Sequence, residues 1–168
     1  MLATKPLQPA LDLRQADGSR PVFVRPMVGV ETFKALTGRN EDEMLAEIQI
    51  GRVRWAFNVS AESNRQFVRI WVRSLDCYRF PDLTQPEKIE DFFGHWLPPV
   101  AHLTGTVLGT TLQKLLNVTG DHIADLIAAE RLEAKVRAIS TGVKGSPKIS
   151  RASLEKFLRA RWLGRGTA

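Results

Sequence analysis

The chain of 168 residues has one cysteine, one tyrosine and three histidines, and these scarcities exclude several classes of site. The lone Cys77 cannot form a disulfide within the chain. His95, His102 and His122 are not spaced like a metal-ligand set, and the acids are scattered, so the sequence predicts no metal site. No nucleophile–base signature is present. We therefore expect a protein that is not an enzyme and that has no catalytic residues, metal ion or cofactor.

Long apolar runs are also missing from the sequence. No stretch approaches the length that crosses a bilayer, and the N-terminus lacks the continuous apolar core of a secretory signal. We therefore expect a cytoplasmic protein with no membrane contact. Hydrophobic residues still make up 43% of the chain, which indicates folded cores rather than disorder.

Positive charge is concentrated at the C-terminal end of the chain. The formal net charge is +6, and residues 141–168, with seven basic side chains and one acid, account for all of it. Lysine and arginine bind nucleic acid by neutralising phosphates and releasing their counterions. The basic segment therefore favours double-stranded DNA as a partner, with a merely solubilising tail as the alternative.

Residues 110–162 have the pattern of two short helices, a hairpin and a closing helix. A turn at 117–120 separates two apolar stripes of helical spacing, and Thr119 is expected to cap the second helix. The Gly/Ser/Pro-rich run at 140–147 predicts the tip of a two-stranded wing. Ser150 is expected to cap the closing helix, which should end near Gly164.

This segment resembles the excisionase and mercury-regulator-like class of winged helix-turn-helix domains. The residues that carry the resemblance are AlaGluArgLeu at 129–132 and, in the closing helix, Arg151, Leu154, Phe157 and Leu158. It covers about a third of the chain. The resemblance implies sequence-directed DNA binding in transcription regulation or DNA recombination.

The same pattern is expected once more, 79 residues earlier in the chain. Setting Phe33 against Leu112 pairs apolar positions without a gap, and the alignment includes Phe57 with Val136. We interpret residues 30–80 as a first, degenerate winged helix-turn-helix unit. The alternative is that any two small units of this kind align by patterning alone.

Prolines bracket an apolar helix between the two expected units. Pro86 suits the first turn of this helix, and Pro98 and Pro99 should stop it. Its broad apolar face predicts that the helix packs between the units and fixes their orientation. The residues on this face that should be buried are Phe92, Phe93 and Trp96.

The expected fold is therefore α+β and mostly helical, with two tandem winged helix-turn-helix units joined by a packed linker helix. The boundaries are an N-terminal arm at 1–29, the first unit at 30–80, the linker at 81–100 and the second unit, with its basic C-terminal helix, at 101–168.

The residues expected at DNA lie mostly in the second unit. The outward face of its second helix should offer Asp121 and His122, because aspartate can accept from cytosine and histidine can donate to guanine. The wing and closing helix should supply phosphate contacts. From the second unit the full set is Thr119, Gly120, Asp121, His122, Lys135, Arg137, Lys144, Lys148, Arg151 and Arg159; from the first it is Arg39, Asn40 and Arg65.

A rival interpretation rests on the second helix of the first unit. Its acids, Glu41, Asp42, Glu43 and Glu47, would repel a phosphate backbone, and this helix would suit a protein partner instead. The alternative function is therefore a protein–protein interaction adaptor that uses the first unit. The target DNA sequence, the partner and the oligomeric state are left open by the sequence.

Overall fold

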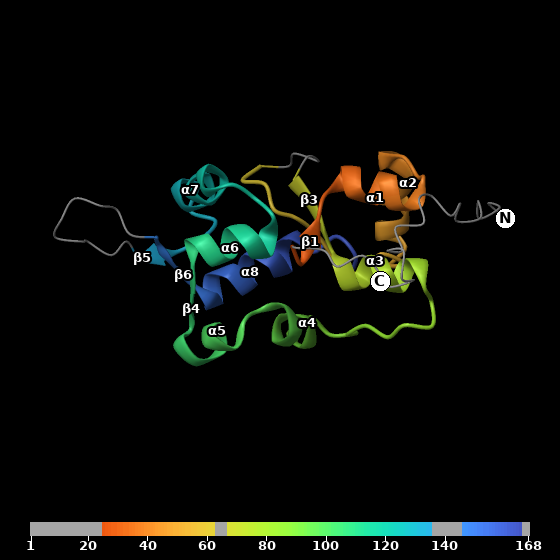
Figure 1. Ribbon diagram of the computed structural model, residues 1–168. Helices are drawn as coiled ribbons and strands as arrows, with labels where there is room; N and C mark the ends of the chain where they lie inside the picture. The colour runs from red at the N-terminus through yellow and green to blue at the C-terminus, as the bar shows by residue number, and fades with distance from the viewer. Residues whose placement is uncertain (1–24, 63–66, 136–145, 166–168) are drawn as a thin grey trace, which may run out of the picture.

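The computed structural model describes residues 25–62, 67–135 and 146–165. Over these residues the protein is α+β and mainly helical, as expected, with eight helices and two antiparallel sheets of three strands each. No helix in this part of the chain is long and apolar enough to cross a bilayer. In Figure 1, α6 and α7 lie at one end of the molecule and α1 and α2 at the other.

The first unit is built in the order strand, two helices, two strands and a helix. Its elements are β1 (Met27–Val28), α1 (Val30–Thr37), α2 (Glu41–Gln49), β2 (Ala56–Asn58), β3 (Val68–Trp71) and α3 (Val72–Arg79). The strand order in its sheet is β1-β3-β2. The expected arm at 1–29 thus ends in a strand of this sheet, because Met27 pairs with Trp71.

The second unit has the same order of elements. They are β4 (Thr106–Leu108), α6 (Gly109–Leu116), α7 (Gly120–Ala128), β5 (Ala134–Lys135), β6 (Lys148–Ser150) and α8 (Arg151–Arg161). Its strand order, β4-β6-β5, matches that of the first sheet. The side chains of Thr119 and Ser150 accept hydrogen bonds from the backbone of α7 and α8, which confirms both expected helix caps.

Backbone conformation repeats along with the element order. Both ends of α6 and of α7 follow those of α1 and α2 by 79 residues. Gly38 and Asn117, also 79 residues apart, end the first helix of each unit with φ of 67° and 52°. Gly51 and Glu130, at the same spacing, both have positive φ after the second helix. Left-handed backbone favours glycine, so its recurrence at equivalent positions indicates the same local geometry in both units.

The expected alignment without a gap is wrong by one residue at β2 and β5. The backbone N–H of Trp55 donates to Ser74 Oγ, and that of Glu133 donates to Ser153 Oγ, each at 3.0 Å. The two serines are 79 residues apart, whereas Trp55 and Glu133 are 78 apart. The first unit therefore has one extra residue, Arg54, before its second strand.

This shift changes which residues correspond across the two sheets. Ala56 pairs with Ile70 and Ala134 with Ile149, so Ala134 is the counterpart of Ala56. The counterpart of Phe57 is consequently Lys135 and not Val136, which lies outside the described residues.

The first sheet is buried on both faces, because successive side chains of a strand point to opposite sides. One face belongs to a core shared with α4 and the second unit; its residues are Met27, Trp55, Phe57 and Trp71. The other face belongs to the first unit's own core; its residues are Val28, Ala56, Val68 and Ile70. The two units therefore share one apolar core, and the first unit has a second core of its own.

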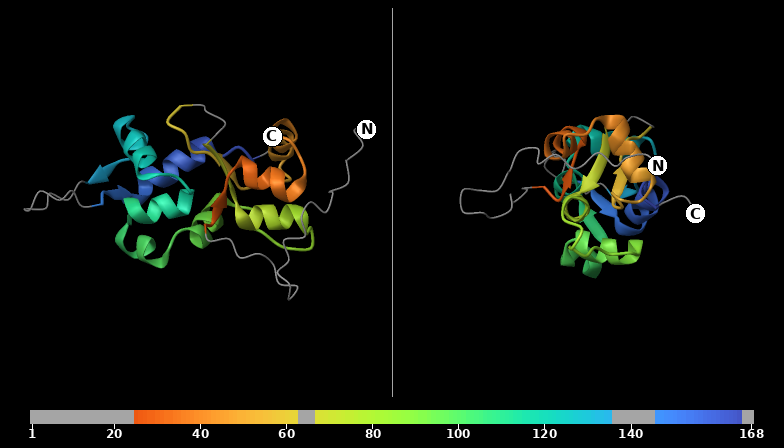
Figure 2. Two further views of the ribbon diagram at one scale, coloured as in Figure 1. Left: turned by 45° about the horizontal axis from the view of Figure 1, so that its top comes forward. Right: turned by 90° about the vertical axis from the view of Figure 1, so that its right-hand side faces the viewer.

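Two helices join the units: α4 (Ile89–Trp96) and α5 (Pro99–Thr104). They lie along one side of the molecule, at the bottom in Figures 1 and 2. The expected burial of Phe92, Phe93 and Trp96 is confirmed, with exposures of 0%, 1% and 4%. Phe92 stacks on Trp55 with ring centroids 5.0 Å apart. The linker helix begins at Ile89 rather than at Pro86, and α5, which starts at the stopping Pro99, was not expected.

Candidate nucleic-acid interface

Two lysines stand opposite each other on the outer face of the second sheet. Lys135 of β5 is the register partner of Lys148 of β6, and both side chains are exposed. Neither lysine has an ion-pair partner among the described residues. Directly opposed like charges weaken a strand pair, and an anion bound between them would remove this penalty. The pair therefore forms a compact cationic site at the base of the expected wing.

The corresponding face of the first sheet has a different environment. The counterparts of Lys135 and Lys148 there are Phe57, which is fully buried, and Arg69, whose Nε donates to the carbonyl oxygen of Asn117 at 3.1 Å. That face is covered by α4 and the second unit. Over the described residues, this face is therefore covered in the first sheet. In the second sheet it is open to solvent and bears the two lysines.

The exposed side of α7 contains no cation. Asp121 and Asp125 lie on this side with Ala124 and Ala128, and all four are exposed. Thr119 and Gly120 are also exposed at the start of the helix. Two carboxylates without a basic residue oppose close approach to phosphates, although they can accept from cytosine amino groups.

The expected outward placement of His122 is wrong. Its side chain is 7% exposed, and Nε2 lies 2.6 Å from the carbonyl oxygen of Val59 in the first unit. The ring also stacks on Phe67, with centroids 4.2 Å apart. His122 extends the buried stripe of α7 onto the first unit, so it joins the two units and does not face a base.

The arginines of α8 are partly engaged within the protein. Arg151 pairs with Glu155 and Arg159 pairs with Glu90 of α4, each at 3.0 Å. Arg161 donates to the carbonyl oxygens of Glu62 and Ala61 at 2.9 and 3.3 Å. The charge that the sequence concentrates here therefore serves partly to tie elements together, although Lys156 and Arg165 remain exposed.

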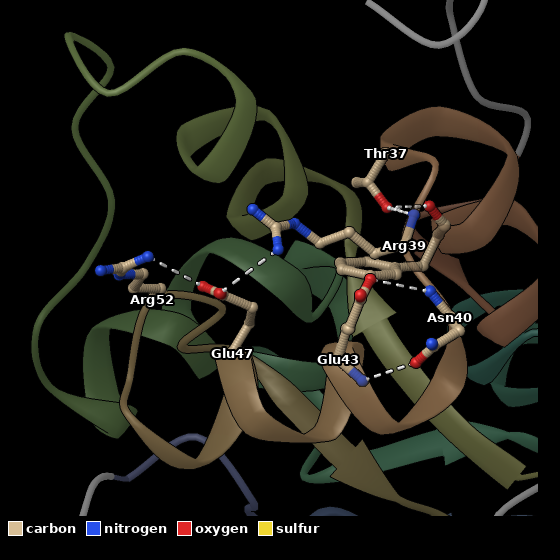
Figure 3. Close-up of polar contacts among 7 residues, drawn as sticks. Thr37, Arg39, Asn40, Glu43, Glu47 and Arg52 are labelled. Atoms are coloured by element: carbon tan, nitrogen blue, oxygen red, sulfur yellow. Dashed lines mark hydrogen bonds and ion pairs between the residues drawn. The ribbon is translucent and has the colours of Figure 1, made fainter. Parts of the chain in front are cut away.

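Two of the first-unit residues expected at DNA, Arg39 and Asn40, are also engaged internally (Figure 3). The Arg39 side chain is 10% exposed and its Nη1 lies 3.8 Å from Glu47 Oε1. Asn40 caps α2: its Oδ1 accepts from the backbone N–H of Glu43 at 2.9 Å, and Glu43 accepts from the Asn40 N–H in return. The expectation that Arg39 extends toward DNA is therefore wrong, and Asn40 has only part of its amide available.

The acidic helix also presents less charge than expected. Glu47 is buried between Arg39 and Arg52, whose Nη1 lies 3.4 Å from Glu47 Oε2 (Figure 3). Glu43 completes the capping box, so two of the four acids of α2 have structural roles within the first unit. The remaining expected residues, Arg65, Arg137 and Lys144, lie outside the described part of the chain.

Arg131 was not among the residues expected at the interface. It follows α7, is exposed, and donates from Nε to the carbonyl oxygen of Ala61 at 3.3 Å. Its neighbour in space is Arg161, whose pKa is lowered by burial and, to a lesser extent, by the charge of Arg131. The AlaGluArgLeu run marked this position, but only as part of a family pattern.

Among the described residues, no group of three histidine, cysteine, aspartate or glutamate side chains is arranged to hold a metal ion. Comparison of the chain with protein-family models, with curated proteins and with solved structures found no match.

Proposed function

We propose that both units are winged helix-turn-helix units and that the second binds double-stranded DNA, with a role in transcription regulation or in the assembly of a recombination or replication complex. The observation that carries this proposal is the opposed pair Lys135 and Lys148. A phosphate group between the two ammonium groups would turn a repulsive pair into a favourable one.

The position of the lysine pair supports the proposal. In winged units the wing follows the backbone beside the groove that the recognition helix enters, and these lysines lie on the two strands at the base of the wing. Lys148 also lies three residues before the start of α8, where Lys156 adds an exposed positive charge to the same unit. Phosphate contacts of this kind position a protein on DNA without reading its sequence.

The surface of α7 predicts weak sequence selectivity. Its exposed residues include Asp121 and Asp125 but no arginine, asparagine or glutamine, which supply most bidentate base contacts. Affinity should therefore come mainly from the backbone. Any base preference should be limited to contacts of Thr119, Asp121 or Asp125.

The test is a titration of a labelled random-sequence duplex with the full-length protein at several salt concentrations. Replacing Lys135 and Lys148 by alanine should weaken binding to all duplexes alike. The slope of log K against log salt should fall by about 0.9 for each phosphate that the variant no longer neutralises. Lys88→Ala, which removes an exposed lysine from the edge of the linker helix, is the matched control and should leave the slope unchanged.

An unchanged affinity and slope in the double variant would contradict the DNA proposal. The second candidate function, the adaptor, would then be preferred. It is favoured by the surface of α2, which has an acidic first turn at its N-terminal end and Ile50, 62% exposed, at its C-terminal end. If the protein is an adaptor, replacing Glu41 and Asp42 by lysine should abolish its binding to a basic protein partner. If it binds DNA, the same variant should bind a duplex as tightly as the unchanged protein or more tightly.

A further inference from the structure

The edge of the first sheet is covered by the residues that follow α8. After α8, the backbone N–H of Leu163 donates to the carbonyl oxygen of Ala56 at 2.8 Å, and Trp162 forms an antiparallel bridge with Phe57. Trp162 Nε1 donates to the carbonyl oxygen of Arg54 at 2.7 Å. Residues 162–164 thus add an extended segment to β2, with Leu163 packed against the core of the first unit.

Gly164 completes this contact. Its backbone carbonyl approaches Gly51, and a Cβ on Gly164 would overlap the carbonyl oxygen of Arg54. The segment therefore consists of a bulky aromatic residue, Trp162, an apolar residue, Leu163, and a residue without a side chain, Gly164. It lies over the turn that leads into β2.

The second unit has the same strand edge. Glu133 accepts from the backbone N–H of Ser150, as Trp55 does from that of Trp71, so these carbonyls face inward in both sheets. Ala134, like Ala56, must then direct its backbone groups to the outside, because successive residues of a strand alternate. β5 is the edge strand of its sheet.

A groove next to this edge is open in the second unit. It has a volume of about 420 Å³ and lies between the turn after α7 and the outer side of α8. The turn residues Glu130 and Arg131 are the counterparts of Gly51 and Arg52, and the C-terminal segment approaches this turn at Gly51 in the first unit. The groove is thus the equivalent of a site that is already filled in the other half of the molecule.

We propose that this groove and the edge of β5 bind an extended, acidic segment of a partner protein, in the way that residues 162–164 bind the first unit. Added strands of this kind gain affinity from main-chain hydrogen bonds and specificity from alternate side chains. The inference rests on the correspondence of the two units and does not depend on DNA binding.

The chemistry of the groove defines the partner segment. Phe157, Ala152 and Ala160 form an apolar floor for a bulky side chain. Three cations, Arg131, Lys156 and Arg161, line the same groove and outnumber its two acids, Glu130 and Glu133. Arg131 and Arg161 also donate to backbone carbonyl oxygens of residues 61 and 62, and carboxylates beside the apolar residue would add a full counter-charge to this cluster.

The probe is a labelled eight-residue peptide with the sequence of residues 159–166 of this chain, in which glutamate replaces the three arginines. It should bind the full-length protein saturably in fluorescence anisotropy. In amide NMR spectra it should shift signals of residues 130–135 and of α8, and not those of residues 51–57.

Two variants test the mode of binding. Ala134→Pro removes an N–H that faces the edge and leaves the bonds between β5 and β6 intact, so the protein should fold and bind the peptide about tenfold more weakly. Lys156→Glu should weaken binding of the acidic peptide and strengthen binding of the peptide that keeps its three arginines. This exchange of preference requires a folded groove, so it tests the proposal even if the proline variant fails to fold.

Several results would overturn the proposal. Absence of saturable binding would do so, as would shifts confined to residues 51–57, because the peptide would then displace the protein's own C-terminal segment. Competition by a DNA duplex that shifts the same signals would assign the groove to nucleic acid. A concentration-dependent doubling of mass that Ala134→Pro abolishes would assign the edge to a second copy of the chain.

Discussion

The Nε2 atom of His122 lies 2.6 Å from the carbonyl oxygen of Val59, and this contact fastens the start of α7 to the strand end of the first unit. The stacking of the imidazole on Phe67 adds an aromatic contact at the same point. The helix expected to read DNA is therefore held by the neighbouring unit.

Replacement of His122 by alanine should destabilise the protein by about 2–3 kcal/mol, because it removes a buried hydrogen bond and the packing of the ring. Denaturant unfolding measures this change in stability. Duplex affinity, measured under conditions where the variant is folded, should fall for all sequences or not at all. A change confined to a single base position would show that His122 contacts a base after all.

Gly164 should be intolerant of any side chain. Gly164→Ala would force the Cβ into the carbonyl group of Arg54, and the resulting shift of the C-terminal segment should cost at least about 2 kcal/mol. Gly94→Ala is the matched control, since no atom lies within 4 Å of a Cβ there. In the helix α4 it should stabilise the protein by about 0.5–1 kcal/mol. Equal melting temperatures for the two variants would contradict the close approach.

The only tyrosine of the chain reports on the first unit's core. Burial, and then the charge of Glu47, raise the pKa of Tyr78 above its ordinary value of 10.0. Because the neutral phenol is favoured in the folded state, this contribution to stability is complete below pH 10 and is lost as the pH rises through the folded pKa. Tyrosinate absorbance should therefore appear at higher pH in the folded protein than in denaturant. Tyr78→Phe, which removes the signal, identifies its source.

Glu47 should behave as a structural residue. Glu47→Gln leaves Arg39 without its buried counter-charge and should cost about 2 kcal/mol, whereas reversal to lysine should unfold the first unit by bringing three cations together. Glu31→Gln breaks an exposed pair with Lys34 and should cost less than about 0.5 kcal/mol. Thermal unfolding compares these variants, and equal costs for Glu47 and Glu31 would contradict the buried role.

The periodic parts of the fold could be predicted from the sequence. The caps at Thr119 and Ser150, the buried face of α4 and the spacing of the helices follow from local chemistry and apolar periodicity. The extra residue Arg54 could not be found in this way, because an apolar pattern tolerates a one-residue shift where a short strand is buried on both faces.

The candidate site was harder to predict because exposure depends on the partner unit. His122 follows a capping residue at the position where an outward-facing side chain is expected, and the sequence contains no local sign that Val59 and Phe67 cover it. Charge counting likewise located the basic segment but not the arginines that are engaged with carbonyl oxygens or with Glu90. The sequence indicates Lys135 and Lys148 by their charge alone, and only the register of β5 and β6 shows that they stand opposite each other.

The covered edge of β2 has a consequence for synthesis of the protein on the ribosome. Residues 162–164 follow the second unit in the chain, so the outer hydrogen-bonding groups of β2 stay uncovered until the whole second unit has been translated. An open strand edge on a nascent chain can pair with neighbouring chains. Truncation after α8 should therefore produce a protein that aggregates during expression, even though every helix and strand of both units is present.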